Sequence, residues 1–221
     1  MIRFPGSCDE VDALGACRRF ADAELLWHGD RDLRAADAIV IPGGFSYGDY
    51  LRAGAIARFS PVMEAVREFA LSGGPVLGIC NGFQVLCEAG LLPGALLPNT
   101  SLRFTFRQVT LDVVNASTRW TAACETGDVL SVPVKHTTGR YYAPEEALDE
   151  LESNGQVLLH YAEGQNPNGS ARDIAGVSNS QKNVFGLMPH PEHAVDPLTG
   201  SADGGKLFES LVAHVDALQP A

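Results

Sequence analysis

Short apolar runs alternate with amphipathic stretches along the first half of the chain. The apolar runs predict strands over residues 2–4, 24–27, 37–41 and 75–79. The stretches between them predict helices over residues 52–58, 62–71 and 82–88, and one more that begins after Asp9, a residue suited to cap it. Strands that alternate with helices are joined by crossovers, so this half predicts an α/β fold with a doubly wound, mostly parallel sheet flanked by helices.

Longer alternating strands replace this pattern in the second half. Strands are predicted over residues 102–114, 129–134, 157–161, 174–177 and 184–188, and Asn168-Gly169 is a hairpin-turn pair. A last amphipathic stretch predicts a helix over about residues 205–218. We therefore expect a single domain over residues 1–221, with a β-rich insertion in its second half.

Composition narrows the class of protein. A chain of 221 residues with 45% hydrophobic and 19% charged residues is typical of one soluble globular domain. No apolar run approaches the ~18 residues that span a bilayer, and the N-terminus has no apolar signal region, so a cytoplasmic protein is expected. The net charge of −11 disfavours nucleic-acid binding. The five cysteines are irregularly spaced without a C-x-x-C pair, which predicts reduced thiols, no disulfide framework and no metal site.

Cys80 is the strongest candidate for chemistry. It lies between the strand expected over 75–79 and the helix expected over 82–88, with Gly78 and Gly82 two residues to either side. This G-x-C-x-G pattern is typical of a nucleophile elbow, and a helix N-terminus favours thiolate over thiol. The alternative is a buried structural cysteine at a strand end. The two glycines and the flanking elements favour the nucleophile.

A cysteine nucleophile needs a base, and the base needs an orienting group. The expected strand over 184–188 is followed by Pro189-His190-Pro191-Glu192-His193. In an extended backbone, residues two apart face the same side, so Glu192 is expected to reach the ring of His190. The predicted catalytic triad is therefore Cys80, His190 and Glu192. His193 is a rival base that is expected to face away from Glu192, and the other histidines are interpreted as surface or core residues.

These motifs resemble those of a known family. Gly78-Ile79-Cys80-Asn81-Gly82-Phe83-Gln84 together with Pro189-His190-Pro191-Glu192 resembles the class I, triad-type glutamine amidotransferases, whose fold is flavodoxin-like. The string Pro42-Gly43-Gly44-Phe45-Ser46-Tyr47-Gly48-Asp49-Tyr50 is more discriminating. It resembles the glutaminase subunits of phosphoribosylformylglycinamidine synthases, enzymes of purine biosynthesis, and the resemblance covers essentially the whole chain.

The resemblance implies the reaction and the roles of the triad. Cys80 would attack the side-chain amide of glutamine and form a γ-glutamyl thioester with release of ammonia. His190 would take the thiol proton, give it to the leaving ammonia and then activate water, while Glu192 holds the imidazole.

Further site residues come from the same resemblance. The oxyanion hole would use backbone N–H groups, best matched by Gly44 and Asn81. Gln84 would shape the substrate pocket. Tyr47 and Arg52 would belong to the interface or ammonia-passage side rather than to the triad.

The resemblance also implies partners. Ammonia would pass to a large synthetase subunit that uses ATP and magnesium to convert formylglycinamide ribonucleotide to the amidine, often with a small third subunit. No G-x-x-x-x-G-K-[ST] loop occurs in this chain, so we expect it to bind no cofactor and expect ATP and magnesium on the partner.

Two segments depart from the family pattern. The first expected strand is short, because the chain begins almost at Phe4-Pro5-Gly6. Lys135-His136-Thr137-Thr138-Gly139-Arg140 stands where the family commonly has Gly-Glu-Gly-Arg. We expect this second departure, with Thr137-Thr138 in place of Gly-Glu, to affect the large-subunit contact or its regulation and to leave the triad untouched.

Two other functions fit the scaffold. A γ-glutamyl hydrolase would release its products to water without a partner, and the Phe45-to-Ala55 string argues against it. A non-catalytic cysteine sensor would be oxidised rather than acylated, and the combination of His190, Glu192, Gln84 and the Gly43-Gly44 loop argues against that.

Overall fold

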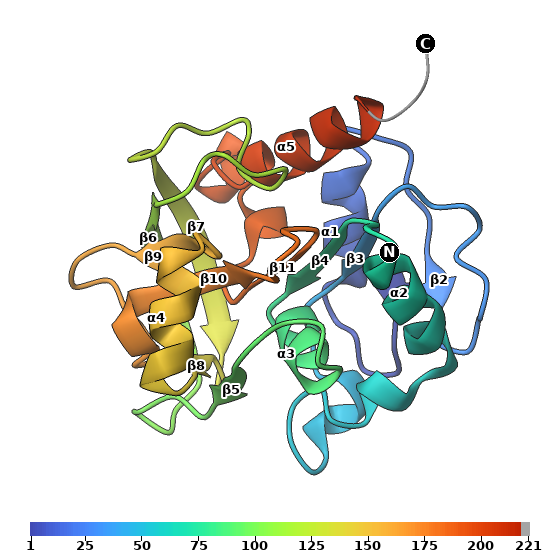
Figure 1. The fold of residues 1–221 in the computed structure, drawn as a ribbon, viewed down its shortest axis with the longest axis horizontal. Coiled ribbons are helices and arrows are strands. Elements are labelled where there is room, and N and C mark those ends of the chain that lie inside the picture. The colour runs from blue at the N-terminus through green and yellow to red at the C-terminus, as the bar shows by residue number, and fades with distance from the viewer. Residues whose placement is uncertain (218–221) are drawn as a thin grey trace.

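A mixed sheet of seven strands forms the centre of the protein in this computed structural model, which describes residues 1–217 (Figure 1). The strand order across the sheet is β3-β4-β11-β10-β9-β6-β7. The strands are β3 (Ile39–Ile41), β4 (Val76–Ile79), β6 (Thr105–Val113), β7 (Val129–His136), β9 (Val157–Tyr161), β10 (Ile174–Ser178) and β11 (Val184–Leu187).

Parallel pairing is confined to one side of the sheet. Within the central sheet, β4 pairs in parallel with both β3 and β11. A separate two-stranded sheet lies beside β3, in which β1 (Ile2–Arg3) pairs in parallel with β2 (Leu26–Trp27). The α/β class and the flanking helices are confirmed. The sheet is less parallel than expected, however, because β11, β10, β9, β6 and β7 pair antiparallel in succession. Loops without crossover helices join β9 to β10 and β10 to β11, so the chain reverses direction at each of these connections.

Helices pack in two pairs against the sheet strands. α1 (Glu10–Cys17) contacts α5 (Gly205–Asp216), and the rings of Phe20 and Phe208 stack between them with centroids 6.3 Å apart. α2 (Pro61–Leu71) lies beside α3 (Asn81–Glu88), where Arg67 donates a hydrogen bond to the carbonyl of Ala89. These helices were expected from the sequence, although position 218 of the last one lies outside the described residues.

The segment over residues 52–58 is not the expected helix. It forms turns and a short 3-10 helix, η2 (Ala57–Phe59). Gly54 has a φ of +79° and packs against the backbone of Gln84 and Val85, where a Cβ atom would come within 2.7 Å of the Val85 nitrogen. Such a left-handed residue at a close backbone contact is incompatible with a continuous α-helix.

Three elements between residues 95 and 153 were not predicted. β5 (Ala95–Leu97) pairs with β8 (Arg140–Tyr142), and α4 (Glu145–Ser153) follows β8. Leu148 and Leu151 are the buried residues of α4. With so few apolar positions in an acidic stretch, the helix leaves a weak periodic signal.

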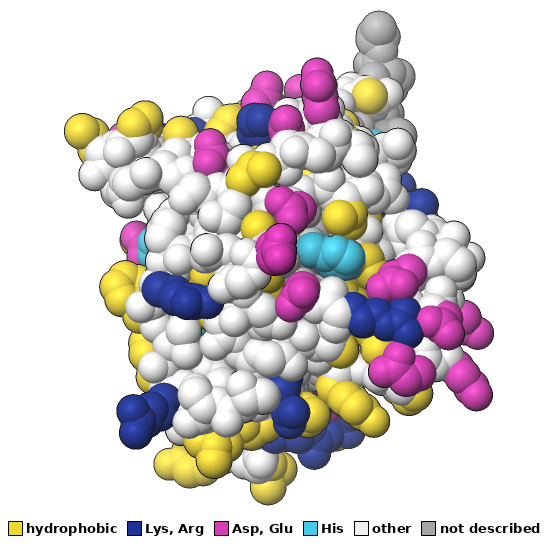
Figure 2. All heavy atoms as spheres, turned by 90° about the vertical axis from the view of Figure 1, so that its left-hand side faces the viewer, with side chains coloured by type: hydrophobic (Ala, Val, Ile, Leu, Met, Phe, Trp, Pro, Cys, Tyr) yellow, Lys and Arg dark blue, Asp and Glu magenta, His cyan; other side chains and the backbone are white. Residues whose placement is uncertain are grey.

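Charged side chains are mixed on the surface. On the face shown in Figure 2, acidic groups lie at the centre, at the top and at the right edge, basic groups are scattered, and apolar groups occur mainly along the lower edge and at the upper left. No helix within residues 1–217 is both long enough and apolar enough to cross a membrane.

The strand register brings three loops to one edge of the sheet. Ile41 and Leu187 end their strands beside Gly78 and Ile79 of β4, because Ile41 pairs with Gly78 and Leu187 pairs with Ile79. The loops that follow carry Gly43-Gly44, Cys80 and His190. Carboxyl ends of parallel strands are where sites form in such sheets, and the candidate residues meet there.

Candidate active site

Cys80 sits in a strained turn between β4 and α3. Its φ of +50° and ψ of −102° are unusual for a residue with a side chain, and the residue is only 5% exposed. Its backbone N–H donates a hydrogen bond of 2.8 Å to the Leu187 carbonyl, which fixes the turn against β11. The geometry is that of the expected elbow.

Both flanking glycines are required by close packing. A Cβ atom on Gly82 would overlap the carbonyl of Ile41, and one on Gly78 would lie 2.7 Å from the carbonyl carbon of Gly82. Helix α3 therefore approaches β3 and β4 closely only because these two positions have no side chain.

His190 and Glu192 form a buried pair. The His190 Nδ1 atom lies 2.6 Å from the Glu192 Oε1 atom, and both side chains are removed from solvent. The pair forms in a way that differs from the sequence prediction, because residues Pro191–His193 adopt a 3-10 helix, η4, rather than an extended strand. The turn of η4 brings the Glu192 carboxylate back to the imidazole.

The surroundings of His190 favour its protonated form. Burial opposes protonation, but the charge of Glu192, its hydrogen bond and the neighbouring Cys80 sulfur outweigh it and raise the pKa of His190 to about 10. The other ring nitrogen, Nε2, is buried and has no hydrogen-bond partner among residues 1–217, so it is free for a proton exchanged with the thiol or substrate.

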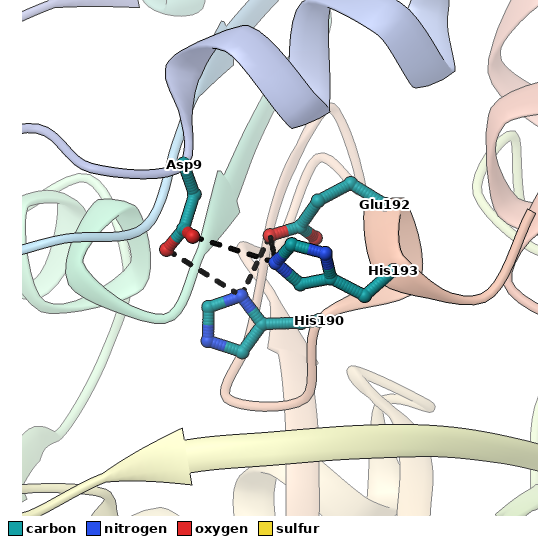
Figure 3. A group of neighbouring side chains, drawn as sticks. All are labelled: Asp9, His190, Glu192 and His193. Atoms are coloured by element: carbon teal, nitrogen blue, oxygen red, sulfur yellow. Dashed lines mark hydrogen bonds and ion pairs between the residues drawn. The ribbon is translucent and has the colours of Figure 1, made fainter. Parts of the chain in front are cut away.

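A second carboxylate, Asp9, was missed by the sequence analysis as a site residue (Figure 3). Asp9 occupies the N-cap position of α1, but its side chain makes no capping hydrogen bond and turns instead toward the histidines. Its Oδ2 atom lies 3.8 Å from His190 Nδ1, and its Oδ1 atom pairs with the Lys135 ammonium and lies 3.4 Å from His193 Nε2. Burial favours the neutral acid, yet the hydrogen bonds from His193 and Lys135 and the charge of His190 hold the pKa of Asp9 well below its usual range.

His193 does not face away as expected. Its Nε2 atom is 2.8 Å from Lys135 Nζ and 3.7 Å from Glu192 Oε1. The tight turn of η4 places His190 and His193 on neighbouring faces, with ring centroids 5.5 Å apart. His193 therefore belongs to the charge cluster around His190.

The four side chains in Figure 3 have the donor types of a metal site. Ligand atoms of Asp9, His190, Glu192 and His193 lie within 4.8 Å of one another. The Lys135 ammonium contacts Asp9 and His193 of this group and already places a positive charge beside the Asp9 carboxylate. The cluster therefore fits a divalent metal poorly.

A cavity of about 70 Å³ opens beside Cys80. Gln84 lines it, and an ordered chain of amides holds that side chain in place. The Gln84 Nε2 atom donates to the Thr138 carbonyl at 2.5 Å, and Gln84 Oε1 accepts from Asn81 Nδ2 at 2.8 Å. Asn81 Oδ1 in turn accepts from the Ser46 backbone N–H at 3.0 Å.

The two predicted oxyanion donors have free N–H groups. Gly44 lines the cavity with a φ of +133°, and Asn81 is the first residue of α3. Neither backbone N–H donates a hydrogen bond to another group within residues 1–217. Free N–H groups at a helix N-terminus and a glycine loop are suited to an oxyanion.

The segment over residues 135–140, which departs from the family pattern, forms part of the site, and its contact with Cys80 is made by Lys135 rather than by Thr137 or Thr138. The Lys135 carbonyl accepts from the Cys80 thiol at 3.9 Å, while its side chain binds Asp9. Thr137 and Thr138 line the cavity. The end of β7 therefore forms one wall of the site.

Two residues assigned to the partner side make internal contacts. The Tyr47 hydroxyl lies 2.7 Å from His28 Nδ1 and 2.8 Å from Ser60 Oγ. Arg52 binds the Glu88 carboxylate through two nitrogens, at 2.5 and 2.6 Å. Neither residue contacts the triad.

A larger cavity, of about 940 Å³, lies away from this chemistry. It is lined from α1, α5 and the segments around β2, and its only thiol is that of Cys17. Burial raises the pKa of that thiol to about 11, which disfavours a reactive thiolate.

Comparisons with known proteins agree on one family. The profile of the CobB/CobQ-like glutamine amidotransferase domain matches residues 1–211. The chain is 56% identical to the phosphoribosylformylglycinamidine synthase subunit PurQ of Rubrobacter xylanophilus, over 96% of both chains. It is 60% identical to PurQ of Mycolicibacterium paratuberculosis, over 97% of this chain and 96% of the relative.

A solved structure shows the same fold. The structure of PurLQS from Thermotoga maritima contains a chain that matches with a TM-score of 0.89 and 41% identity, over 97% of this chain and 96% of that one. A glutamine amidotransferase from the same organism has 15% identity and a TM-score of 0.62, which shows the shared fold alone.

Proposed function

This chain belongs to the CobB/CobQ-like glutamine amidotransferase family, and from that premise we propose that Cys80, His190 and Glu192 are its catalytic triad. Its function is that of the glutaminase subunit of phosphoribosylformylglycinamidine synthase, an enzyme of purine biosynthesis. The observation that carries the triad is the 2.6 Å contact between buried His190 and Glu192 at the strand edge that also holds Cys80.

Cys80 acts as the nucleophile. Its sulfur attacks the side-chain amide carbon of glutamine, and the C–N bond breaks as ammonia leaves. His190 gives the departing nitrogen the proton that it took from the thiol. Water activated by His190 then cleaves the γ-glutamyl thioester, so glutamate leaves and the thiol is restored.

Glu192 orients the imidazole and stabilises its charged form. The hydrogen bond to His190 Nδ1 directs Nε2, the unpartnered nitrogen, toward the reacting groups. The free N–H groups of Gly44 and Asn81 receive the oxyanion of each tetrahedral intermediate, and Gln84 shapes the pocket. Such a donor typically contributes about 10² to 10³ in rate.

The ammonia serves a partner subunit. The chain works in a complex with the synthetase subunit PurL and the small subunit PurS, as the assembly named PurLQS indicates. We place ATP and magnesium on the synthetase subunit, which converts formylglycinamide ribonucleotide to the amidine. The high identity to PurQ chains argues against the γ-glutamyl hydrolase and cysteine-sensor alternatives.

We further propose one domain over residues 1–221 and a cytoplasmic location. One continuous cluster of buried apolar residues, which includes Ile2 and Leu211, supports the single domain. The cysteines at positions 8, 17, 80, 87 and 124 are all free thiols, which fits a reducing compartment.

The test is Cys80→Ala in the reconstituted complex. We expect loss of glutamine-dependent amidine formation with ammonia-dependent formation retained, because the synthetase would still accept free ammonia. Cys87→Ala is the matched control, since Cys87 lies at the other end of α3 and should leave both activities unchanged. Glutamine-dependent turnover by the Cys80 variant would overturn the proposed mechanism.

A further inference from the structure

The carboxylate of Asp49 lacks a counter-ion at the edge of the catalytic cavity. Asp49 and Asp9 are the two carboxylates that line this cavity. Asp9 is paired with Lys135 and His193, and Lys135 is the only lysine or arginine in the lining. Within residues 1–217 the Asp49 carboxylate accepts a single hydrogen bond, from Asn81 Nδ2 at 3.2 Å, and makes no ion pair.

That carboxylate lies close to the nucleophile. Asn81 directly follows Cys80, and its amide group contacts both Asp49 and Gln84. The same amide donor thus connects the proposed pocket residue to Asp49. A substrate whose amide reaches the Cys80 sulfur would extend its other end along this wall.

The chain holds Asp49 in this place at a conformational cost. Tyr47, Gly48 and Asp49 have φ values of +55°, +70° and +54°, and Leu51 has +71°. The Tyr47 hydroxyl fixes the loop through His28 and Ser60. Left-handed conformations at non-glycine residues persist only where the surroundings impose them, and they cluster at binding sites.

The negative charge of Asp49 is partly buried and has no cation beside it among residues 1–217. Burial raises the pKa of Asp49 to about 6, although the hydrogen bond from Asn81 acts in the opposite direction. A ligand cation would supply the missing charge. Glutamine carries one, the α-ammonium group, at the end of the molecule opposite the reacting amide.

We propose that Asp49 binds the α-ammonium group of glutamine and so selects α-amino acid amides over other primary amides. The proposal rests on the glutaminase function and assigns to Asp49 substrate binding rather than a step in the chemistry. Its role is distinct from that of Gln84, because a neutral amide cannot neutralise an ammonium group.

The experiment compares glutamine with glutaramate, which has the same amide and distal carboxylate without the α-amino group. In the complex with the synthetase partner, we expect wild-type protein to prefer glutamine in kcat/KM by about 10- to 100-fold, the range of a charged hydrogen bond. Asp49→Asn keeps the acceptor for Asn81 but loses the charge. It should raise the KM for glutamine and reduce this preference to a few-fold, with ammonia-dependent synthesis unchanged.

Glu88→Gln is the matched control. It removes the negative charge of Glu88, which binds Arg52 just after Asp49 in the chain. Glu88 does not line the cavity, so the preference for glutamine should remain. Asp49→Glu retains the negative charge and should retain most of the preference for glutamine. If the asparagine variant does not fold, the preference of the glutamate variant tests the role of Asp49.

Three results would overturn the role of Asp49. They are a wild-type protein that does not prefer glutamine, an asparagine variant with an unchanged preference, or a glutamate variant that loses it. Each leaves the glutaminase function intact, whereas glutamine turnover by Cys80→Ala would overturn the proposed mechanism itself.

Discussion

At the scale of single residues, His190 lies between two carboxylates at unequal distance. Glu192 is 2.6 Å from Nδ1 and Asp9 is 3.8 Å from it, and Asp9 also binds Lys135. The closer carboxylate is a hydrogen-bond partner, whereas the second acts mainly through its charge.

We expect Glu192→Gln to lower kcat for glutamine by about 10² or more, and Asp9→Asn by about 10-fold, with KM little changed in both. Removing Glu192 also lowers the pKa of His190, because the charge and hydrogen bond of that carboxylate favour the imidazolium. Steady-state kinetics and the rate of Cys80 alkylation by iodoacetamide measure both effects. Equal losses in the two variants would contradict this ranking.

The positions of site residues were predictable where a motif carries them. The elbow glycines marked Cys80, and the short Pro-His-Pro-Glu segment marked His190 and Glu192. Asp9 and Lys135 could not be found in this way, because their contact joins segments far apart in the chain. Asp9 even appeared as a helix cap, a role that its position fits and its side chain does not perform.

At the scale of elements, the close contact between β3, β4 and α3 sets the position of Cys80. The first turn of α3 sits directly against the carbonyl that ends β3. The α3 N-terminus therefore cannot shift without moving Cys80.

We expect Gly82→Ala to destabilise the protein by about 2–4 kcal/mol, because the new Cβ atom would overlap the Ile41 carbonyl. Gly15→Ala is the matched control in α1. Its Cβ atom would have no neighbour within 4 Å, so a gain of about 0.5–1 kcal/mol from helix propensity is expected. Denaturant unfolding measures both, and equal effects would show that packing at Gly82 is unimportant.

The elements themselves were largely predictable from periodicity, with failures at identifiable places. Residues 52–58 have helical composition, but the packing of Gly54 against α3 prevents a helix. The antiparallel half depends on which strands pair, and periodicity within one strand contains no such information.

At the scale of the whole molecule, large apolar side chains remain exposed around the cavity. Phe45 and Phe104 line it, and Leu102 and Phe106 are 80% and 70% exposed on the adjoining segment. Ammonia that reaches a partner active site must be kept from bulk water. We therefore expect the synthetase subunit to cover this rim.

Leu102→Asp should weaken assembly with the synthetase subunit at least about 10-fold, since it places a charge in an apolar contact. Its φ of +55° suits aspartate, so the fold should tolerate the change. Leu198→Asp, at a position 95% exposed in η5 (Pro197–Thr199), is the control and should assemble normally. Sedimentation of the mixed subunits measures the difference, and equal affinities would place the contact elsewhere.

The wall formed by β7 and η4 has a consequence for the protein while it is being made. A ribosome releases Cys80 long before Lys135 of β7, and His190 emerges near the end of translation. An unfinished chain therefore has the Cys80 thiol without the imidazole of His190 and the carboxylate of Glu192. Glutamine hydrolysis by the proposed triad therefore requires a chain that extends through Glu192.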